Sequence, residues 1–129
     1  MIRTRENEPL RVVVIDDEDV LRTCLCRAMQ SRGWCAVGAE TAAAGPSLIK
    51  FSLPDLVLLD LRMPGMSGLD AIPHLLQLAT QAYIVMLTGQ GSNALAAEAL
   101  KRGARDYLTK PVDADQIQAA YERIVLRAP

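Results

Sequence analysis

Four features of the sequence could do chemistry together: the pair Asp16 and Asp17, the single Asp60, Thr88 and Lys110. Each stands directly after a run of apolar or β-branched residues, which is where an expected strand ends. Carboxylates suit hard cations, a hydroxyl can donate a hydrogen bond, and a lysine supplies a compact positive charge. Each feature alone is also explained by a helix cap or a turn. Their chemistry therefore depends on whether the fold brings them together.

Two expected strands lead into the carboxylates. Residues 11–15 form a β-branched run that ends on Asp16, and residues 56–59 form an unbroken apolar run that ends on Asp60. Such a run is typical of a parallel strand buried on both faces. The turn residues that follow, Pro64 to Gly68, end this strand. Asp60 is thus expected at the carboxyl end of a central strand, where open α/β sheets bind ligands.

The rest of the chain alternates between the two periodicities. Further strands are expected at 35–38, 83–87 and 106–109. Helices are expected at about 20–33 and 41–51, from a Ser67 and Asp70 capping box, from Ser92 to before Gly103, and from Asp113 to about Leu126. Pro46 predicts a late start or a kink in the second helix, and Pro73 a bend in the third.

Five strands alternating with five helices predict an α/β fold, a single doubly wound parallel sheet. We expect the flavodoxin-like strand order 2-1-3-4-5, which places the first and third strands side by side. The domain is expected to span residues 10–127, after a flexible N-terminal tail at residues 1–9.

Composition excludes several classes of partner. Fourteen basic and fifteen acidic residues give a net charge of −1, which argues against direct nucleic-acid binding and against a membrane-surface protein. No apolar run is long enough to cross a bilayer. The three cysteines, Cys24, Cys26 and Cys35, lack metal-ligand spacing and are expected to be reduced thiols of a cytoplasmic protein.

The carboxylates at one sheet edge predict a metal site. Asp16, Asp17 and Asp60 would repel one another unless a divalent cation lay between them. Because the candidate ligands are all oxygens, we expect Mg²⁺, with Mn²⁺ also possible. Lys110 and Thr88 could then meet the oxygens of a phosphoryl group, and Asp60 is the best candidate for the nucleophile that attacks phosphorus.

The sequence resembles the response-regulator receiver domains of two-component signalling, the CheY-like superfamily. The resemblance covers about residues 10–126. It is carried by residues 13–17 (VVIDD), 54–60 (PDLVLLD), 63–68 (MPGMSG), 87–89 (LTG) and 103–111 (GARDYLTKP).

The resemblance implies a role for each matching position. Asp60 would be the phosphoacceptor, with Thr88 and Lys110 on the phosphoryl oxygens. Asp16, Asp17, Asp60 and the backbone carbonyl of Arg62 would bind the metal. Thr88 and Tyr107 would form the switch, Arg62 and Gln90 would tune the lifetime of the phosphoryl group, and the bond before Pro111 would be cis.

The resemblance also implies partners. The phosphoryl group would come from a histidine kinase or a histidine phosphotransfer protein, and the output would pass to an effector domain or protein. The fourth helix, fifth strand and fifth helix would form the readout surface and a possible homodimer interface. A receiver catalyses its own phosphorylation and dephosphorylation, so we do not expect a conventional enzyme.

Other functions fit the sequence less well. A phosphatase of the haloacid dehalogenase type needs a second aspartate two residues after the nucleophile, and that position holds Arg62. A nucleotide- or flavin-binding module needs a phosphate-binding loop after the first strand, but residues 16–19 are all acidic. A degenerate receiver that serves only as a protein-interaction module is the remaining alternative.

Overall fold

The computed structural model describes residues 8–63, 67–78, 81–89 and 93–127. Three of the features expected from the sequence lie wholly or largely outside these residues: the N-terminal tail, the tuning position Gln90 and the helix cap Ser92. Within the described part of the chain, no helix is long and apolar enough to cross a membrane.

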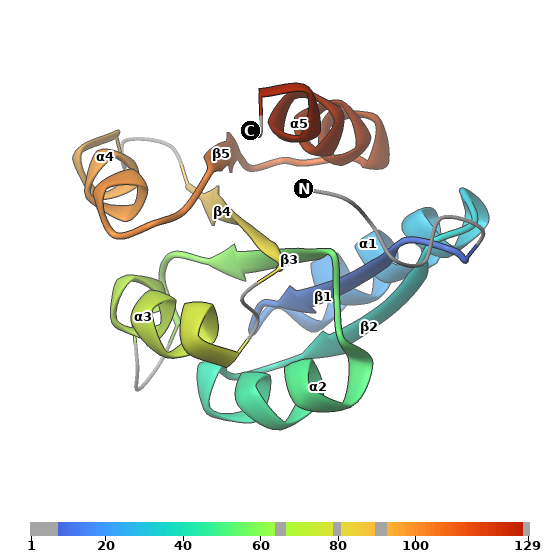
Figure 1. Cartoon of the computed structure of the whole chain (residues 1–129), viewed down its shortest axis with the longest axis horizontal. Helices are drawn as coiled ribbons and strands as arrows, with labels where there is room; N and C mark the ends of the chain where they lie inside the picture. Colours follow the sequence, from blue (N-terminus) through green and yellow to red (C-terminus); the bar gives the residue numbers. More distant parts are fainter. Residues whose placement is uncertain (1–7, 64–66, 79–80, 90–92, 128–129) are drawn as a thin grey trace.

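Five parallel strands form one sheet, in the order β2-β1-β3-β4-β5 (Figure 1). The order confirms the predicted doubly wound topology. The strands are β1 (Arg11–Ile15), β2 (Cys35–Ala39), β3 (Leu56–Asp60), β4 (Tyr83–Thr88) and β5 (Asp106–Thr109). All residues of β3 and β4 are buried, as expected for the continuous apolar runs of central strands covered on both faces.

Helices cover both faces of the sheet. One face packs residues such as Val12 and Val14 against α1 (Asp19–Ser31) and α5 (Ala114–Arg127). The other face packs Val13 and Ile15 against α2 (Gly45–Ser52), α3 (Gly68–Leu78) and α4 (Asn93–Lys101). The alternation along β1 follows from the two-residue period of a strand.

The prolines and caps refine the expected helices. Pro46 lies in the first turn of α2, after a short 3₁₀ segment, η1 (Ala42–Ala44), so the predicted late start is found rather than a kink. Helix α3 continues across Pro73. At the start of α5, Asp113 and Gln116 each accept a hydrogen bond from the other's backbone N–H at 2.9 Å, which completes a capping box.

The strand register brings the functional candidates to one edge. Ile15 pairs with Leu59, so Asp16, directly after β1, lies beside Asp60, the last residue of the adjacent strand β3. Thr88 pairs with Thr109, directly before Lys110. All four candidates therefore lie at the carboxyl edge of the sheet, and Asp16 and Asp60 lie at the switch point between β1 and β3.

Candidate functional site

Three carboxylates meet at the carboxyl edge of the sheet. Asp16, Asp17 and Asp60 each place one oxygen within 4.8 Å of the other two. Asp16 and Asp60 are buried, whereas Asp17 is exposed. The pair after β1 and the single residue of β3 thus form one cluster, as the sequence predicts.

Asp60 lies at the end of β3, with only 4% of its surface exposed. Its Oδ1 accepts a hydrogen bond from the backbone N–H of Arg62 at 3.2 Å. Burial and the nearby charge of Asp16 raise the pKa of Asp60 to about 6, against the opposing effects of Lys110 and the Arg62 N–H. The site therefore disfavours the ionised form of Asp60 until positive charge is added.

Asp16 presents one satisfied and one unsatisfied oxygen. Its Oδ1 accepts a hydrogen bond from the backbone N–H of Glu18 at 2.8 Å. Its Oδ2 is buried without a hydrogen-bond partner among the described residues, although the Lys110 ammonium lies 2.9 Å away. A buried, negatively charged oxygen without an aligned donor is costly, so this atom is available to a cation.

Lys110 supplies the positive charge at the site. Its Nζ lies 2.9 Å from Asp16 Oδ2, 2.9 Å from Glu18 Oε1 and 3.5 Å from Asp60 Oδ1. Burial lowers the pKa of Lys110, but its contacts with Glu18 and Asp16 outweigh this effect and leave the pKa above its usual value. Lys110 is therefore a permanent cation that partly neutralises the cluster.

The donor set fits a hard divalent cation. The cluster offers only carboxylate oxygens, one of which is buried and lacks a donor. Mg²⁺ prefers oxygen ligands and retains several waters, so three carboxylates at an open edge are sufficient. Asp16, Asp17 and Asp60 would hold it. The contribution of the Arg62 carbonyl stays a prediction, since the observed contact of Arg62 is its N–H to Asp60.

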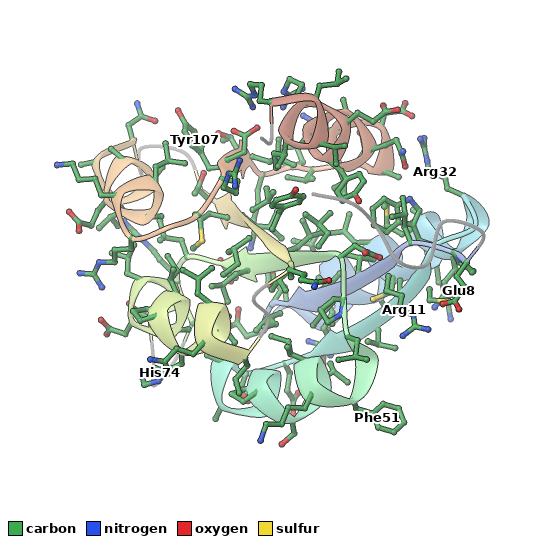
Figure 2. All side chains as sticks on the ribbon, viewed as in Figure 1. Glu8, Arg11, Arg32, Phe51, His74 and Tyr107 are labelled. Atoms are coloured by element: carbon green, nitrogen blue, oxygen red, sulfur yellow. The ribbon has the colours of Figure 1, made fainter. Side chains whose placement is uncertain are left out.

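Thr88 and Tyr107, the expected switch residues, lie on the neighbouring strands β4 and β5. Thr88 is buried, and its hydroxyl donates to the carbonyl of Leu108 at 3.5 Å, a contact toward β5 rather than toward the carboxylates. Tyr107 lies on β5 with 37% of its surface exposed, in the region between α4 and α5 (Figure 2). The Lys110–Pro111 peptide bond is cis, as the resemblance implies.

Three residues support the site in ways that the sequence did not predict. Glu18 contacts Lys110, which lies 92 positions away in the chain, a separation with no local signal. Arg22 donates to the backbone carbonyl of Asp16 at 2.6 Å and lies against Gly38, where a Cβ would meet it. A Cβ at Gly68 would collide with the backbone oxygen of Asp60, so only glycine lets α3 start this close to β3.

The sequence of the chain is similar to those of known signalling regulators. The family model described as "Response regulator receiver domain" matches residues 12–122. The photosynthetic apparatus regulatory protein RegA of Rhodovulum sulfidophilum is 43% identical over 88% of this chain and 61% of its own length. The chain thus spans about three-fifths of that relative. The chemotaxis protein CheY of Bacillus subtilis is 31% identical over 88% of this chain and 95% of its own length.

Solved structures agree with these relatives. A response regulator receiver domain protein from Clostridium thermocellum superposes with a TM-score of 0.82 at 28% identity, covering 92% of this chain and 95% of its own. A response regulator from Burkholderia pseudomallei, solved with a phosphorylated aspartic acid, calcium ion and citrate, reaches 0.82 at 31% identity over 91% of this chain and 71% of its own. Sequence and fold lead to the same assignment: the chain belongs to the family of response regulator receiver domains.

Proposed function

We propose that this receiver domain is a phosphoacceptor of a two-component or phosphorelay system, in which Asp60 takes a phosphoryl group in the presence of Mg²⁺ or Mn²⁺. The observation that carries the proposal is the position of Asp60, buried between two other carboxylates and 3.5 Å from the Lys110 ammonium. The Burkholderia relative, whose structure contains a phosphorylated aspartic acid and a calcium ion, supports it.

The donor in this proposal is a phosphohistidine of a histidine kinase or of a histidine phosphotransfer protein. A carboxylate oxygen of Asp60 attacks phosphorus, and the phosphorus–nitrogen bond to the imidazole breaks. The electron pair leaves with the imidazole nitrogen, which then takes a proton. When bound, the metal ion would neutralise the carboxylates and the phosphoryl oxygens.

The chain's own residues orient and stabilise the phosphoryl group. The N–H of Arg62 holds Asp60 Oδ1 in place. The Lys110 ammonium could contact the phosphoryl oxygens, because its Nζ already lies 3.5 Å from the Asp60 carboxylate. Thr88 would rotate its hydroxyl from Leu108 toward the phosphoryl oxygens. The domain is thus a phosphoacceptor rather than an enzyme that turns over a separate substrate.

The partners and the cellular location of the domain are part of the same proposal. Receiver domains pair with histidine kinases and effector domains, and the surface of α4, β5 and α5 is the candidate for contact with an effector or with a second copy. A reducing, cytoplasmic location is supported by three cysteines that are all free thiols.

Mass spectrometry of the intact protein tests the proposal. After incubation with a small phosphodonor such as acetyl phosphate, the wild type should gain one phosphoryl group when Mg²⁺ is present and none in EDTA. Asp60→Asn should gain none, whereas the control Asp115→Asn, on the exposed surface of α5, should behave as the wild type. Failure of the wild type to accept a phosphoryl group would favour the degenerate interaction module.

A further inference from the structure

Three carboxylates lie within ion-pair distance of the Lys110 ammonium, and only two of them belong to the candidate metal cluster. Asp16 and Asp60 belong to the candidate metal cluster, but Glu18 does not. Glu18 Oε1 nevertheless lies 2.9 Å from Nζ, as near as Asp16 Oδ2 and nearer than Asp60 Oδ1. Only 18% of the Lys110 side chain is exposed, so its charge faces mainly these three groups.

The backbone fixes Glu18 at this place. Its N–H donates to Asp16 Oδ1 at 2.8 Å, and its carbonyl accepts from the N–H of Arg22 at 2.9 Å, so Glu18 is the N-cap residue directly before α1. The adjacent Asp19 faces Arg22 instead of Lys110. Of these two neighbouring carboxylates, Glu18 is the one that contacts the lysine, and the bonds of its backbone fix where its side chain starts.

We propose, on the basis of the function proposed above, that Glu18 is a positioning residue that competes with the phosphoryl group for Lys110. A divalent cation would compensate Asp16 and Asp60, because both belong to its ligand set. Glu18 would then be the carboxylate that still holds Lys110. A phosphoryl group on Asp60 must draw the ammonium away from Glu18, and this contact opposes the phosphorylated state.

Binding of beryllofluoride, a phosphoryl mimic, measures this competition. The full chain is titrated with beryllofluoride at saturating Mg²⁺, with the affinity for Mg²⁺ alone measured separately for each protein. Glu18→Gln should bind beryllofluoride about two- to five-fold more tightly than the wild type, the range expected for loss of a partly exposed ion pair. Asp19→Asn removes the same charge one residue away and serves as the matched control.

Reactivity of the lysines gives an independent readout in the metal-free protein. The chain has three lysines, Lys50, Lys101 and Lys110, so the first two are internal references. Acetylation by acetic anhydride, which transfers one acetyl group to the lysine Nζ and releases acetate, followed by peptide mass spectrometry, should show Lys110 more reactive in Glu18→Gln than in the wild type. Asp19→Asn should leave the ratio of the three lysines unchanged.

The outcomes separate the two proposals. Tighter beryllofluoride binding in Glu18→Gln than in Asp19→Asn supports the competition. Equal affinities in the two variants would show that only net charge matters, and an unchanged Lys110 reactivity would show that Glu18 does not hold the lysine. Either result would overturn the role of Glu18. A wild type that binds no beryllofluoride would instead contradict the phosphoacceptor function, and the role of Glu18 with it.

Discussion

Asp60 combines two properties that oppose each other in the folded protein. It is buried at the end of β3, next to Asp16, and these surroundings raise its pKa to about 6. The reaction that we propose requires its ionised form as the nucleophile. Lys110 and the N–H of Arg62 lower the pKa only in part, so the site becomes fully suited to an ionised Asp60 when a cation is bound.

The raised pKa predicts how stability depends on pH in the metal-free protein. Because the folded pKa exceeds the ordinary value of 3.8, Asp60 contributes stability that is complete below about pH 4 and is lost as pH rises through about 6. Asp60→Asn should therefore unfold with a free energy about 1–3 kcal/mol higher than the wild type at pH 8. This advantage should vanish near pH 4.

Urea denaturation in EDTA at several pH values checks this expectation. Glu122→Gln, which removes an exposed carboxylate on α5, is the control and should follow the wild type at every pH. An Asp60→Asn advantage of the same size at pH 4 and pH 8 would contradict the assigned pKa and point to packing instead.

At the scale of elements, α3 and α4 are linked by an arginine. Pro73 lacks an N–H, so it cannot donate the usual helical hydrogen bond to the carbonyl four residues earlier, that of Leu69. Arg102, just after α4, donates to this carbonyl at 3.2 Å and also contacts Asp70 at 3.4 Å and Glu98 at 3.2 Å. The proline in one helix is thus compensated by a side chain from the next.

Replacement of Arg102 should lower the free energy of unfolding more when Pro73 is present than when it is replaced. We expect Arg102→Ala to lower the free energy of unfolding by about 0.5–1.5 kcal/mol, the range for one hydrogen bond. Pro73→Ala restores an N–H to α3, so Arg102→Ala should cost less in that background. A double-mutant cycle by urea denaturation measures the coupling. If Arg102→Ala costs the same free energy in both backgrounds, the hydrogen bond from Arg102 to the Leu69 carbonyl does not compensate for the proline. Lys101→Ala, at the end of α4, controls for the loss of a positive charge.

At the scale of the whole molecule, metal binding should stabilise the fold. Mg²⁺ would bind the folded cluster and not the unfolded chain, so its effect follows mass action, about 1.4 kcal/mol at ten times Kd. Asp17→Asn should lose most of this effect because it removes one of three cluster carboxylates. Asp19→Asn should lose little. Thermal melts with increasing Mg²⁺ compare the variants, and equal losses would mean that the acidic loop acts only through its total charge.

The contacts of Thr88 give the site a route to the distant surface. Its carbonyl accepts from the N–H of Lys110 at 2.7 Å, and its hydroxyl donates to the carbonyl of Leu108, so Thr88 bonds both to β5 and to the residue that follows it. A phosphoryl group that drew the Thr88 hydroxyl inward would break the second bond and release Leu108. The half-exposed Tyr107 lies beside Leu108 on β5 and could then exchange its outward position for an inward one.

NMR spectra with Mg²⁺ and beryllofluoride test this route. The wild type should show shifts at Asp16, Asp17 and Asp60 and also along α4, β5 and α5. Thr88→Ala should still accept a phosphoryl group, but its shifts should stay near the carboxylates. If the chemical shifts of the wild type changed only at the carboxylates, with Tyr107 unchanged, the switch mechanism would be wrong.

Much of this molecule follows from local sequence pattern. The apolar runs at 56–59 and 83–87, the alternation with helices and the polar residue after each strand were sufficient to predict the strand order and the meeting of Asp16, Asp17, Asp60 and Lys110. These features are predictable because parallel strands in one sheet must end at the same edge, whatever their separation in the chain.

Other features were decided only by tertiary structure. The contact of Glu18 with Lys110, the donor that Arg102 gives to Leu69 and the close approach of Gly68 to Asp60 join residues whose spacing carries no periodic signal. The raised pKa of Asp60 likewise depends on burial, which three-dimensional packing sets. A sequence pattern specifies which face or edge a residue occupies, whereas side-chain contacts between elements depend on how those elements pack.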